Sequence, residues 1–362
     1  MNALSEQERL ARLRLARTDR VGPITFIELI RREGSAAEAL ERLPELSRRA
    51  GGTGVTPPPE ARIDEEVKRG AALGCRLIVW GDADYPKALA ALDAPAPVLW
   101  TRGRTDLLSR DALGMVGARV ASASGQRFAR GLAAELGRSG FVVVSGMARG
   151  VDAAAHEGAL PTGTVAVLGG GVDDIYPSDN ATLYDRLIED GCVVSESPVG
   201  ARAQARDFPR RNRIIAGLSR GVIVVEAELR SGSLITARLA AEQGREVFAV
   251  PGSPLDPRAN GTNDLIRQGA ILCEGLDDVL RGLEGQGGLF EPRDRWGQSD
   301  RRREPEADLA DRVLALLGPT ATSRDEIIRA TSAPAGAVAG VLLELVLSGQ
   351  AAFTETGGVL RL

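Results

Sequence analysis

Short apolar runs and helical stretches alternate through the middle of the chain. The runs contain mostly β-branched residues, and most are separated by a segment with helical periodicity; they are Leu77–Trp80, Leu113–Val116, Phe141–Val144, Val165–Leu168, Cys192–Val194, Val222–Val225, Val247–Val250 and Ile271–Cys273. Continuous runs of this kind are typical of strands buried on both faces. We therefore expect residues 62–283 to form an open α/β domain, a parallel sheet with helices on both faces.

The N-terminal residues, 1–60, are patterned as short helices instead. Ser5 and Glu8 have the spacing of a capping box. Val21-Gly22-Pro23 interrupts the pattern, and a second helix starts near Phe26. We expect a small helical domain here, followed by a linker or exposed loop over residues 51–59.

The C-terminal residues predict a second small domain. Residues 284–306 are dense in charge and poor in apolar residues, which indicates a flexible linker. Residues 307–362 then show helices over Leu309–Leu317 and Ala335–Leu347, with a capping box at Ser323 and Glu326 between them. Two short runs around a turn at residues 355–358 follow. Three helices and a β-hairpin predict a winged helix.

Composition narrows the class of protein. The 362 residues carry a formal net charge of −4, so any nucleic-acid contact must come from a local basic patch. The three cysteines stand far apart, which indicates reduced thiols. We find no signal-peptide pattern and no run of about 18 apolar residues. We expect a cytoplasmic protein with no membrane contact.

Glycine and serine follow several of the predicted strands. In an open parallel sheet, ligands bind beyond the carboxyl ends of the strands, and the free N–H groups of helix starts attract anions. The loops concerned are Gly117-Ala118-Arg119, Ser145 to Asp152, Gly169-Gly170-Gly171 and Ser231-Gly232-Ser233. Together with Arg119 and Arg149 they predict a phosphate-binding rim. The alternative is that these glycines only close tight turns.

Cofactor and catalytic motifs are missing from the same loops. Neither GxGxxG nor GxxxxGK[ST] is present, so we expect no dinucleotide or nucleoside-triphosphate cofactor. His156 is the only histidine and no metal-binding spacing occurs. We assign His156 a structural role and Asp152 the role of a helix-start carboxylate. We expect no catalytic residues, no metal and no cofactor, and hence a protein that is not an enzyme.

The most basic segment surrounds an aromatic residue. Residues 202–220 carry six arginines against one acid, Asp207. Pro209 suits the first turn of a helix, which places Phe208 at the helix mouth among guanidinium groups. This arrangement suits unpaired bases, which stack on the ring while arginines hold the phosphates. The alternative is that Phe208 belongs to the core and the arginines form a solvated face.

The predicted third helix of the winged helix does not suit DNA. Ala335–Leu347 contains Glu344 and no lysine or arginine. A helix in the major groove needs donors for phosphates and base edges. We therefore expect this domain to be structural or to bind a protein.

The central residues resemble those of a known family. SGMARGVDAAAH, TVAVLGGGVDDIYP, SESPVG, FPRRNRIIAGLS, SGSLITARLAAEQGREVFAVPG and GTNDLIRQGA occur in this order over residues 75–283. They look like the DNA-processing protein A family (DprA, also called Smf). The N-terminal helices resemble that family's sterile-alpha-motif-like or helix-hairpin-helix-like module, and residues 307–362 resemble its winged helix.

The resemblance implies an extended Rossmann-like fold that binds single-stranded DNA and loads a RecA-type recombinase onto it during natural transformation. It also implies a homodimer formed through the Rossmann-like domain. The DNA pocket of the family carries over onto Arg119, Ser145, Gly146, Met147, Ala148, Arg149, Gly150, Phe208, Arg211, Asn212 and Arg213. The phosphate-binding rim predicted from the loops adds three further residues, Gly117, Gly232 and Ser233. The family's Gly-Ser-Arg turn reads Gly117-Ala118-Arg119 here, so one hydroxyl contact is lost.

Two other hypotheses remain at this point. A nucleotide-acting enzyme resembling the phosphoribohydrolases also uses a glycine-rich rim, with a glutamate for which Glu226 is the candidate, although the PGGxGT signature is missing. A winged-helix transcription factor would read duplex DNA through residues 307–362.

Overall fold

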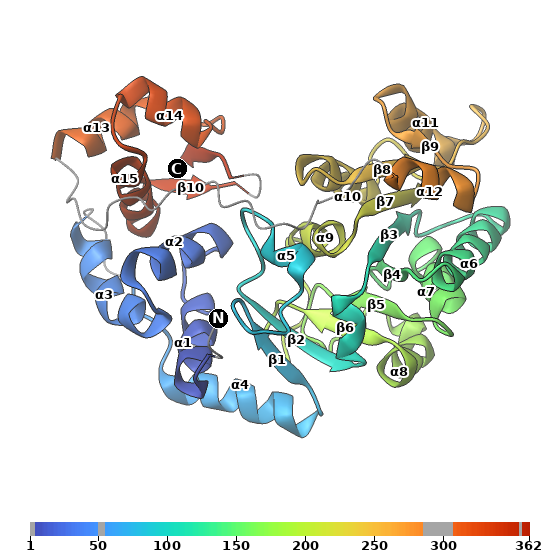
Figure 1. Ribbon diagram of the computed structural model, residues 1–362, viewed down its shortest axis with the longest axis horizontal. Coiled ribbons are helices and arrows are strands. Elements are labelled where there is room, and N and C mark those ends of the chain that lie inside the picture. Colours follow the sequence, from blue (N-terminus) through green and yellow to red (C-terminus); the bar gives the residue numbers. More distant parts are fainter. Residues whose placement is uncertain (1–3, 50–54, 285–306, 355–356) are drawn as a thin grey trace.

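A nine-stranded sheet forms the centre of the computed structural model, which describes residues 4–49, 55–284, 307–354 and 357–362 (Figure 1). The strands lie in the order β1-β2-β6-β5-β4-β3-β7-β8-β9. Their bounds are β1 Arg76–Val79, β2 Val98–Gly103, β3 Ala112–Gly117, β4 Val142–Ser145, β5 Thr164–Val167, β6 Cys192–Ser195, β7 Gly221–Val225, β8 Glu246–Ala249 and β9 Ile271–Leu272. In this order the seven strands β6, β5, β4, β3, β7, β8 and β9 run parallel to one another, which confirms the predicted α/β class.

Helices cover both faces of this sheet because its strands are apolar on both sides. Val222 and Val224 pack on one face with α9 and α10, while Ile223 and Val225 pack on the other with α6, α7 and α12. The helices are α5 Lys87–Ala90, α6 Ala123–Arg138, α7 Val151–Ala159, α8 Ala181–Asp190, α9 Asp207–Leu218, α10 Gly232–Glu242, α11 Asn260–Arg267 and α12 Leu276–Leu283, with 3-10 turns η1 Thr105–Ser109, η2 Ser178–Asn180 and η3 Pro257–Ala259. Period-2 alternation along each strand thus divides the core into two layers.

One edge of the sheet differs from the prediction. The apolar-run pattern missed β2, which follows Pro95 and Pro97, two residues that usually mark loops. β2 pairs antiparallel with both β1 and β6. Between β1 and β2 lies only the four-residue helix α5, which is too short to cover a parallel crossover.

The N-terminal helices close the outer edge of β1. They are α1 Glu6–Ala16, α2 Pro23–Glu33, α3 Ala36–Arg49 and α4 Glu60–Ala72. Ser5 accepts the Glu8 N–H at the start of α1 (3.2 Å), as its spacing predicts. Arg9 of α1 donates to the carbonyl of Leu77 (2.6 Å), so a side chain takes the place of a further strand.

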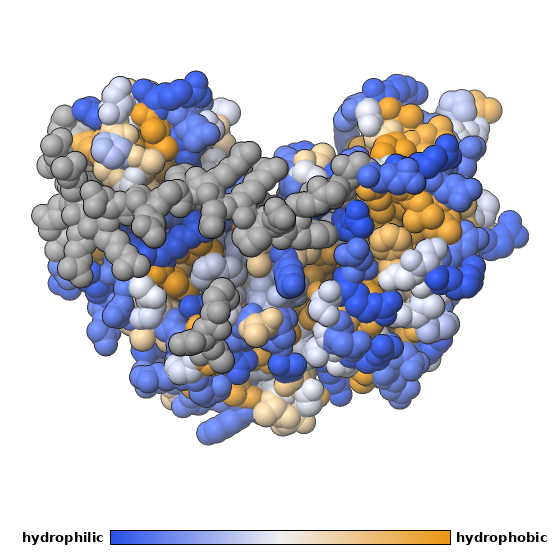
Figure 2. Space-filling model, in the orientation of Figure 1, coloured by the Kyte–Doolittle hydropathy of each residue, from blue (hydrophilic) through white to orange (hydrophobic). Residues whose placement is uncertain are grey.

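The winged helix packs on these N-terminal helices. It contains α13 Ala307–Leu316, α14 Arg324–Thr331, α15 Ala335–Ser348, β10 Ala351–Phe353 and β11 Val359–Arg361. Leu343 and Leu347 of α15 are buried in the same core as Phe26 of α2. An ion pair between Arg324 and Glu28 (3.1 Å) joins the two units. In the space-filling view this part of the molecule and the α11–α12 end of the sheet form separate lobes (Figure 2).

Two further sequence predictions concern the linker and membrane contact. The predicted linker, 284–306, lies outside the described residues except for Glu284. Among the described residues, no single helix is long and apolar enough to cross a membrane. By length and composition alone, α14 and α15 pass as a pair, and they are bent by 116° relative to each other.

Candidate functional site

A hollow of about 370 Å³ lies where the order of the strands reverses. From β3 the chain proceeds through β4, β5 and β6 on one side, and then returns to place β7 on the other side of β3. The loops after β3 and β7 therefore diverge and leave a crevice, the usual ligand position in such a sheet. Of the residues predicted from the sequence, the hollow is lined by Gly117, Arg119, Ala148, Phe208, Arg211, Asn212, Gly232 and Ser233.

Helix α9 presents one face to this hollow. Phe208, Arg211, Asn212 and Ile215 all line it, and their spacing of three and four residues places them on one side of a helix. Arg213 lies two positions after Arg211 and so points elsewhere. Its guanidinium binds the Glu196 carboxylate (2.6 Å) and the carbonyl of Ala94 (3.0 Å) in a buried position. Arg213 is therefore not among the residues that line the hollow.

Phe208 lies at the wall of the hollow with cations and a second ring around it. The guanidinium carbon of Arg119 is 5.6 Å from the centre of the ring, and that of Arg211 is 6.0 Å away. The ring of Tyr176 lies 5.6 Å from that of Phe208, tilted by 47°. Phe208 is only half-buried, so it is not a core residue. Tyr176 is 53% exposed, and sequence reasoning missed it although it follows the strand run Val165–Leu168.

Arg211 supports the site through hydrogen bonds to the ends of two strands. Its Nη1 donates to the carbonyls of Gly146 (2.6 Å) and Val167 (2.5 Å), which ties together the ends of β4 and β5. A Cβ atom at position 146 would overlap this guanidinium, so the close approach requires glycine. Burial lowers the pKa of Arg211 to about 10, and Asp152 opposes the shift. Arg211 therefore stays charged at neutral pH, but most of its donors are used inside the protein.

Two other arginines keep their donors free. Arg119 and Arg230 line the hollow, are exposed, and make no hydrogen bond or ion pair within the described part of the chain. Arg230 was missed because its segment, Glu228-Leu229-Arg230, has balanced charge and no motif. These two guanidiniums are the available cations for a phosphate at the hollow.

Internal carboxylates occupy two of the helix starts that the sequence assigned to anions. Glu226 accepts the N–H of Ser122 (2.8 Å) and its hydroxyl at the start of α6. Asp152 accepts the N–H groups of Gly146 (3.2 Å) and Ala148 (3.3 Å) before α7. These N–H groups are therefore not free for a ligand, and Asp152 lies in the first turn of α7, where the sequence predicted a helix-start carboxylate.

The start of α10 also lines the hollow. Ser231 caps this helix by accepting the N–H of Ser233 (3.3 Å). Gly232 is exposed beside it, and Asn212 donates to its carbonyl (3.4 Å). This helix start and the two free arginines form the anion-binding side of the site.

The loop from Ser145 to Gly150 supports the site more than it lines it. The Ser145 hydroxyl donates to the carbonyl of Met115 (2.6 Å) inside the sheet, and Met147 is fully buried. Arg149 is exposed but pairs with Asp179 (3.3 Å). Of the loop residues predicted to contact DNA, Ala148 lines the hollow, and Ser145, Gly146, Met147, Arg149 and Gly150 do not.

The residues considered for catalysis are engaged elsewhere. His156 is buried, with Nδ1 2.7 Å from the Thr164 hydroxyl, and burial lowers its pKa to about 3. Glu226, which the phosphoribohydrolase hypothesis requires, is held by Ser122. Within the described residues, no three metal-ligating side chains form a group. The geometry gives that enzyme hypothesis no support.

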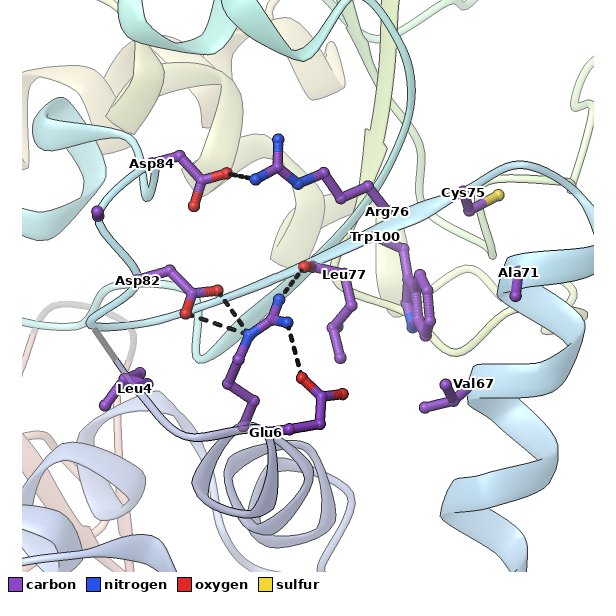
Figure 3. Close-up of a pocket in the computed structure, with 12 residues that line it drawn as sticks. Leu4, Glu6, Val67, Ala71, Cys75, Arg76, Leu77, Asp82, Asp84 and Trp100 are labelled. Carbon is purple, nitrogen blue, oxygen red and sulfur yellow. Dashed lines mark hydrogen bonds and ion pairs between the residues drawn. The ribbon is translucent and has the colours of Figure 1, made fainter.

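A second hollow of about 450 Å³ lies between α1, α4 and β1 (Figure 3). Its charged side chains neutralise one another: Arg9 pairs with Asp82 (3.2 Å) and Glu6 (3.2 Å), and Arg76 pairs with Asp84. Because these cations are satisfied, this hollow lacks the free donors of the first one.

Comparison with known proteins identifies the three units. Residues 76–284 match the family described as DNA recombination-mediator protein A, residues 6–68 a DprA-like N-terminal HHH domain, and residues 298–353 a DprA winged helix domain. Protein Smf of Escherichia coli is 41% identical over 79% of this chain and 77% of the relative. Protein Smf of Synechocystis is 37% identical over 74% of this chain and 75% of the relative.

Solved structures agree with these matches. The crystal structure of DNA processing protein A from Streptococcus pneumoniae is 38% identical, with a TM-score of 0.58, over 68% of this chain and 81% of that one. The protein of the same name from Helicobacter pylori is 31% identical, with a TM-score of 0.53, over 57% and 95%. The domain order, the parallel sheet and the sequence matches agree, and this chain belongs to the DNA recombination-mediator protein A (DprA/Smf) family.

Proposed function

We propose that this chain binds single-stranded DNA at the hollow between the β3 and β7 loops and acts as a recombination mediator. The observation that carries the proposal is that two unpaired arginines, Arg119 and Arg230, and the half-buried ring of Phe208 line one crevice, with the exposed ring of Tyr176 packed against Phe208. The Helicobacter pylori relative is described by its single-stranded DNA binding mode, which supports the same ligand class here.

The site suits an unpaired strand for two physical reasons. An unpaired base has a free π face that can stack on Phe208 or Tyr176, whereas bases in a duplex are already stacked on their neighbours. Phosphates on the same strand can reach Arg119, Arg230 and the start of α10. Since the whole chain carries a net charge of −4, attraction depends on this local group of donors.

The finer parts of the proposal rest on the family. We infer that the protein hands the bound strand to a RecA-type recombinase during natural transformation, forms a homodimer through the Rossmann-like domain and acts in the cytoplasm. The match to a family of recombination mediators supports these assignments. The proposed pocket consists of Gly117, Arg119, Ala148, Phe208, Arg211, Asn212, Gly232 and Ser233, extended by Tyr176 and Arg230.

Salt-titrated fluorescence anisotropy tests the DNA assignment. Labelled dT20 should bind more tightly than a duplex of equal length, and two or three phosphate contacts should give a slope of log K against log salt of about −1.4 to −2.1. Phe208→Leu keeps an apolar side chain but removes the ring, so it should weaken dT20 binding by about 1–3 kcal/mol.

Phe128→Leu is the matched control, because Phe128 is also half-buried but lies on α6 within the apolar layer on the other face of the sheet. Equal affinity for duplex and single strand, or equal effects of the two variants, would refute the assignment.

A further inference from the structure

Exposed apolar side chains occur in the loops at the carboxyl ends of the strands. Among the described residues the large exposed hydrophobics are Val120, Tyr176, Leu229, Leu255, Leu272, Leu316 and Leu362. The first four all lie in loops that follow the carboxyl ends of parallel strands, namely β3, β5, β7 and β8. Single exposed apolar residues are ordinary, but a group at one functional edge indicates a contact surface.

The loops that carry these four side chains follow the order of the strands. Along the sheet the order is β5, β4, β3, β7 and β8, so the loops carry Tyr176, Val120, Leu229 and Leu255 in turn. The ends of β5 and β8 are four inter-strand spacings of about 4.8 Å apart, or about 19 Å. We call these four residues the apolar row. It begins at the Phe208 site, and Val120 also lines the hollow.

Hydrogen bonds tie each of these loops to its neighbour. The bonds are Asn180 Nδ2 to the Met147 carbonyl (2.8 Å), Val151 N to the Ala118 carbonyl (3.2 Å), Ser122 N to the Glu226 carboxylate (2.8 Å) and Ala227 N to the Arg258 carbonyl (2.6 Å). They connect the β5 and β4, β4 and β3, β3 and β7, and β7 and β8 loops in turn. The row is therefore carried on loops that are hydrogen-bonded to one another, which lowers the ordering cost of binding.

The charges along the row favour an anionic partner. Arg119 and Arg230 are unpaired within the described chain, whereas Asp256 is neutralised by Arg258 (2.9 Å). Glu228 opposes this trend, since it is an exposed acid that lines the hollow and has no ion pair among the described residues. Exposed apolar side chains interspersed with free guanidiniums suit a polymer that alternates apolar faces with phosphates.

We propose that Val120, Leu229 and Leu255 extend the base-contacting surface of Phe208 and Tyr176 across the sheet edge, so that single-stranded DNA crosses the strands as far as the loop after β8. This inference rests on the proposed function and adds the path of the strand. The continuity of the row with the Phe208 site selects DNA over a protein as its occupant.

Tryptophan placed in the row tests the path. Leu255 is 92% exposed, so Leu255→Trp should not disturb the fold, and its emission above the wild-type background should be quenched by saturating dT20. Leu362→Trp is the matched control, because Leu362 is 73% exposed in the winged helix, and its emission should not change. The double variant Leu229→Ser, Leu255→Ser should weaken dT20 binding about fivefold.

The outcomes separate this inference from the proposed function. If anisotropy shows dT20 bound to Leu255→Trp but the emission is unchanged, the path is wrong and DNA binding stands. If wild-type protein fails to bind dT20, both proposals fail. If a RecA-type recombinase, and not dT20, changes the Leu255→Trp emission, the row is a protein contact and the inference is overturned.

Discussion

Replacing Arg119 with alanine should separate DNA binding from stability. Arg119 is exposed, makes no hydrogen bond or ion pair among the described residues, and lies over the Phe208 ring at 5.6 Å. An exposed contact of that kind contributes about 0.5–1 kcal/mol to folding. A hydrogen bond to a charged phosphate contributes about 1.5–3 kcal/mol to binding. Arg119→Ala should therefore weaken dT20 binding about 10- to 150-fold with little change in the unfolding midpoint.

The salt dependence gives a second readout of the same variant. Losing one phosphate contact should make the slope of log K against log salt less steep by about 0.7. Arg119→Lys keeps the point charge but not the forked donors, so it should retain the slope and lose part of the affinity.

Arg138→Ala is the matched control, since it removes an exposed arginine at the other end of α6. If Arg119→Ala and Arg138→Ala gave the same affinity and the same slope, the reasoning about the hollow would be refuted.

Three further predictions follow from the buried and charged groups. Arg211→Ala leaves two buried carbonyls and Asp152 without their cation, so urea unfolding should show a loss of about 3–5 kcal/mol, and an unchanged midpoint would contradict the supporting role. The pKa of His156 falls to about 3 on folding, so its stabilising contribution is complete above pH 6.5 and decreases as pH falls towards 3. Between pH 7 and 5 the wild type should lose about 2 kcal/mol more than His156→Gln, as measured by parallel urea titrations. Glu228→Gln removes the unpaired carboxylate from the hollow and should tighten dT20 binding by about 0.3–1 kcal/mol, whereas weaker binding would show that the phosphates lie elsewhere.

The strands that the sequence predicted well are those whose environment is uniform. The parallel strands are covered on both faces, so runs such as Val222–Val225 are apolar without interruption. β2 lies beside β1 at the edge of the sheet and begins after two prolines, so its apolar run was less distinct from a loop. The sequence could not predict the direction of β2 either, because strand direction depends on the length of the connection and not on the composition of the strand.

The candidate site was predictable where it depended on chain neighbours. Arg119 follows the end of β3 by two residues, Ser233 lies in the first turn of α10, and Phe208 and Arg211 share a helical face at a spacing of three. The sequence could not show that Glu226 binds Ser122, because the two residues are 104 positions apart. A carboxylate from a distant loop can fill a helix start as well as an external phosphate can, so a glycine-rich loop by itself does not indicate a free anion site.

The position of α15 bears on where DNA can bind in this molecule. A winged helix normally presents its third helix to the major groove. Here Leu343 and Leu347 of that helix are buried against α2 and α3, and Arg20 and Ser47 donate to the carbonyl of Leu347 at 3.2 and 3.4 Å. Undocking would expose these leucines and break those hydrogen bonds, and the helix that came free would still carry no lysine or arginine. Duplex binding through α15 would therefore cost packing and hydrogen bonds and would gain no cation for the DNA phosphates. The hollow beside β3 and β7, in contrast, already holds unpaired guanidiniums and accessible rings.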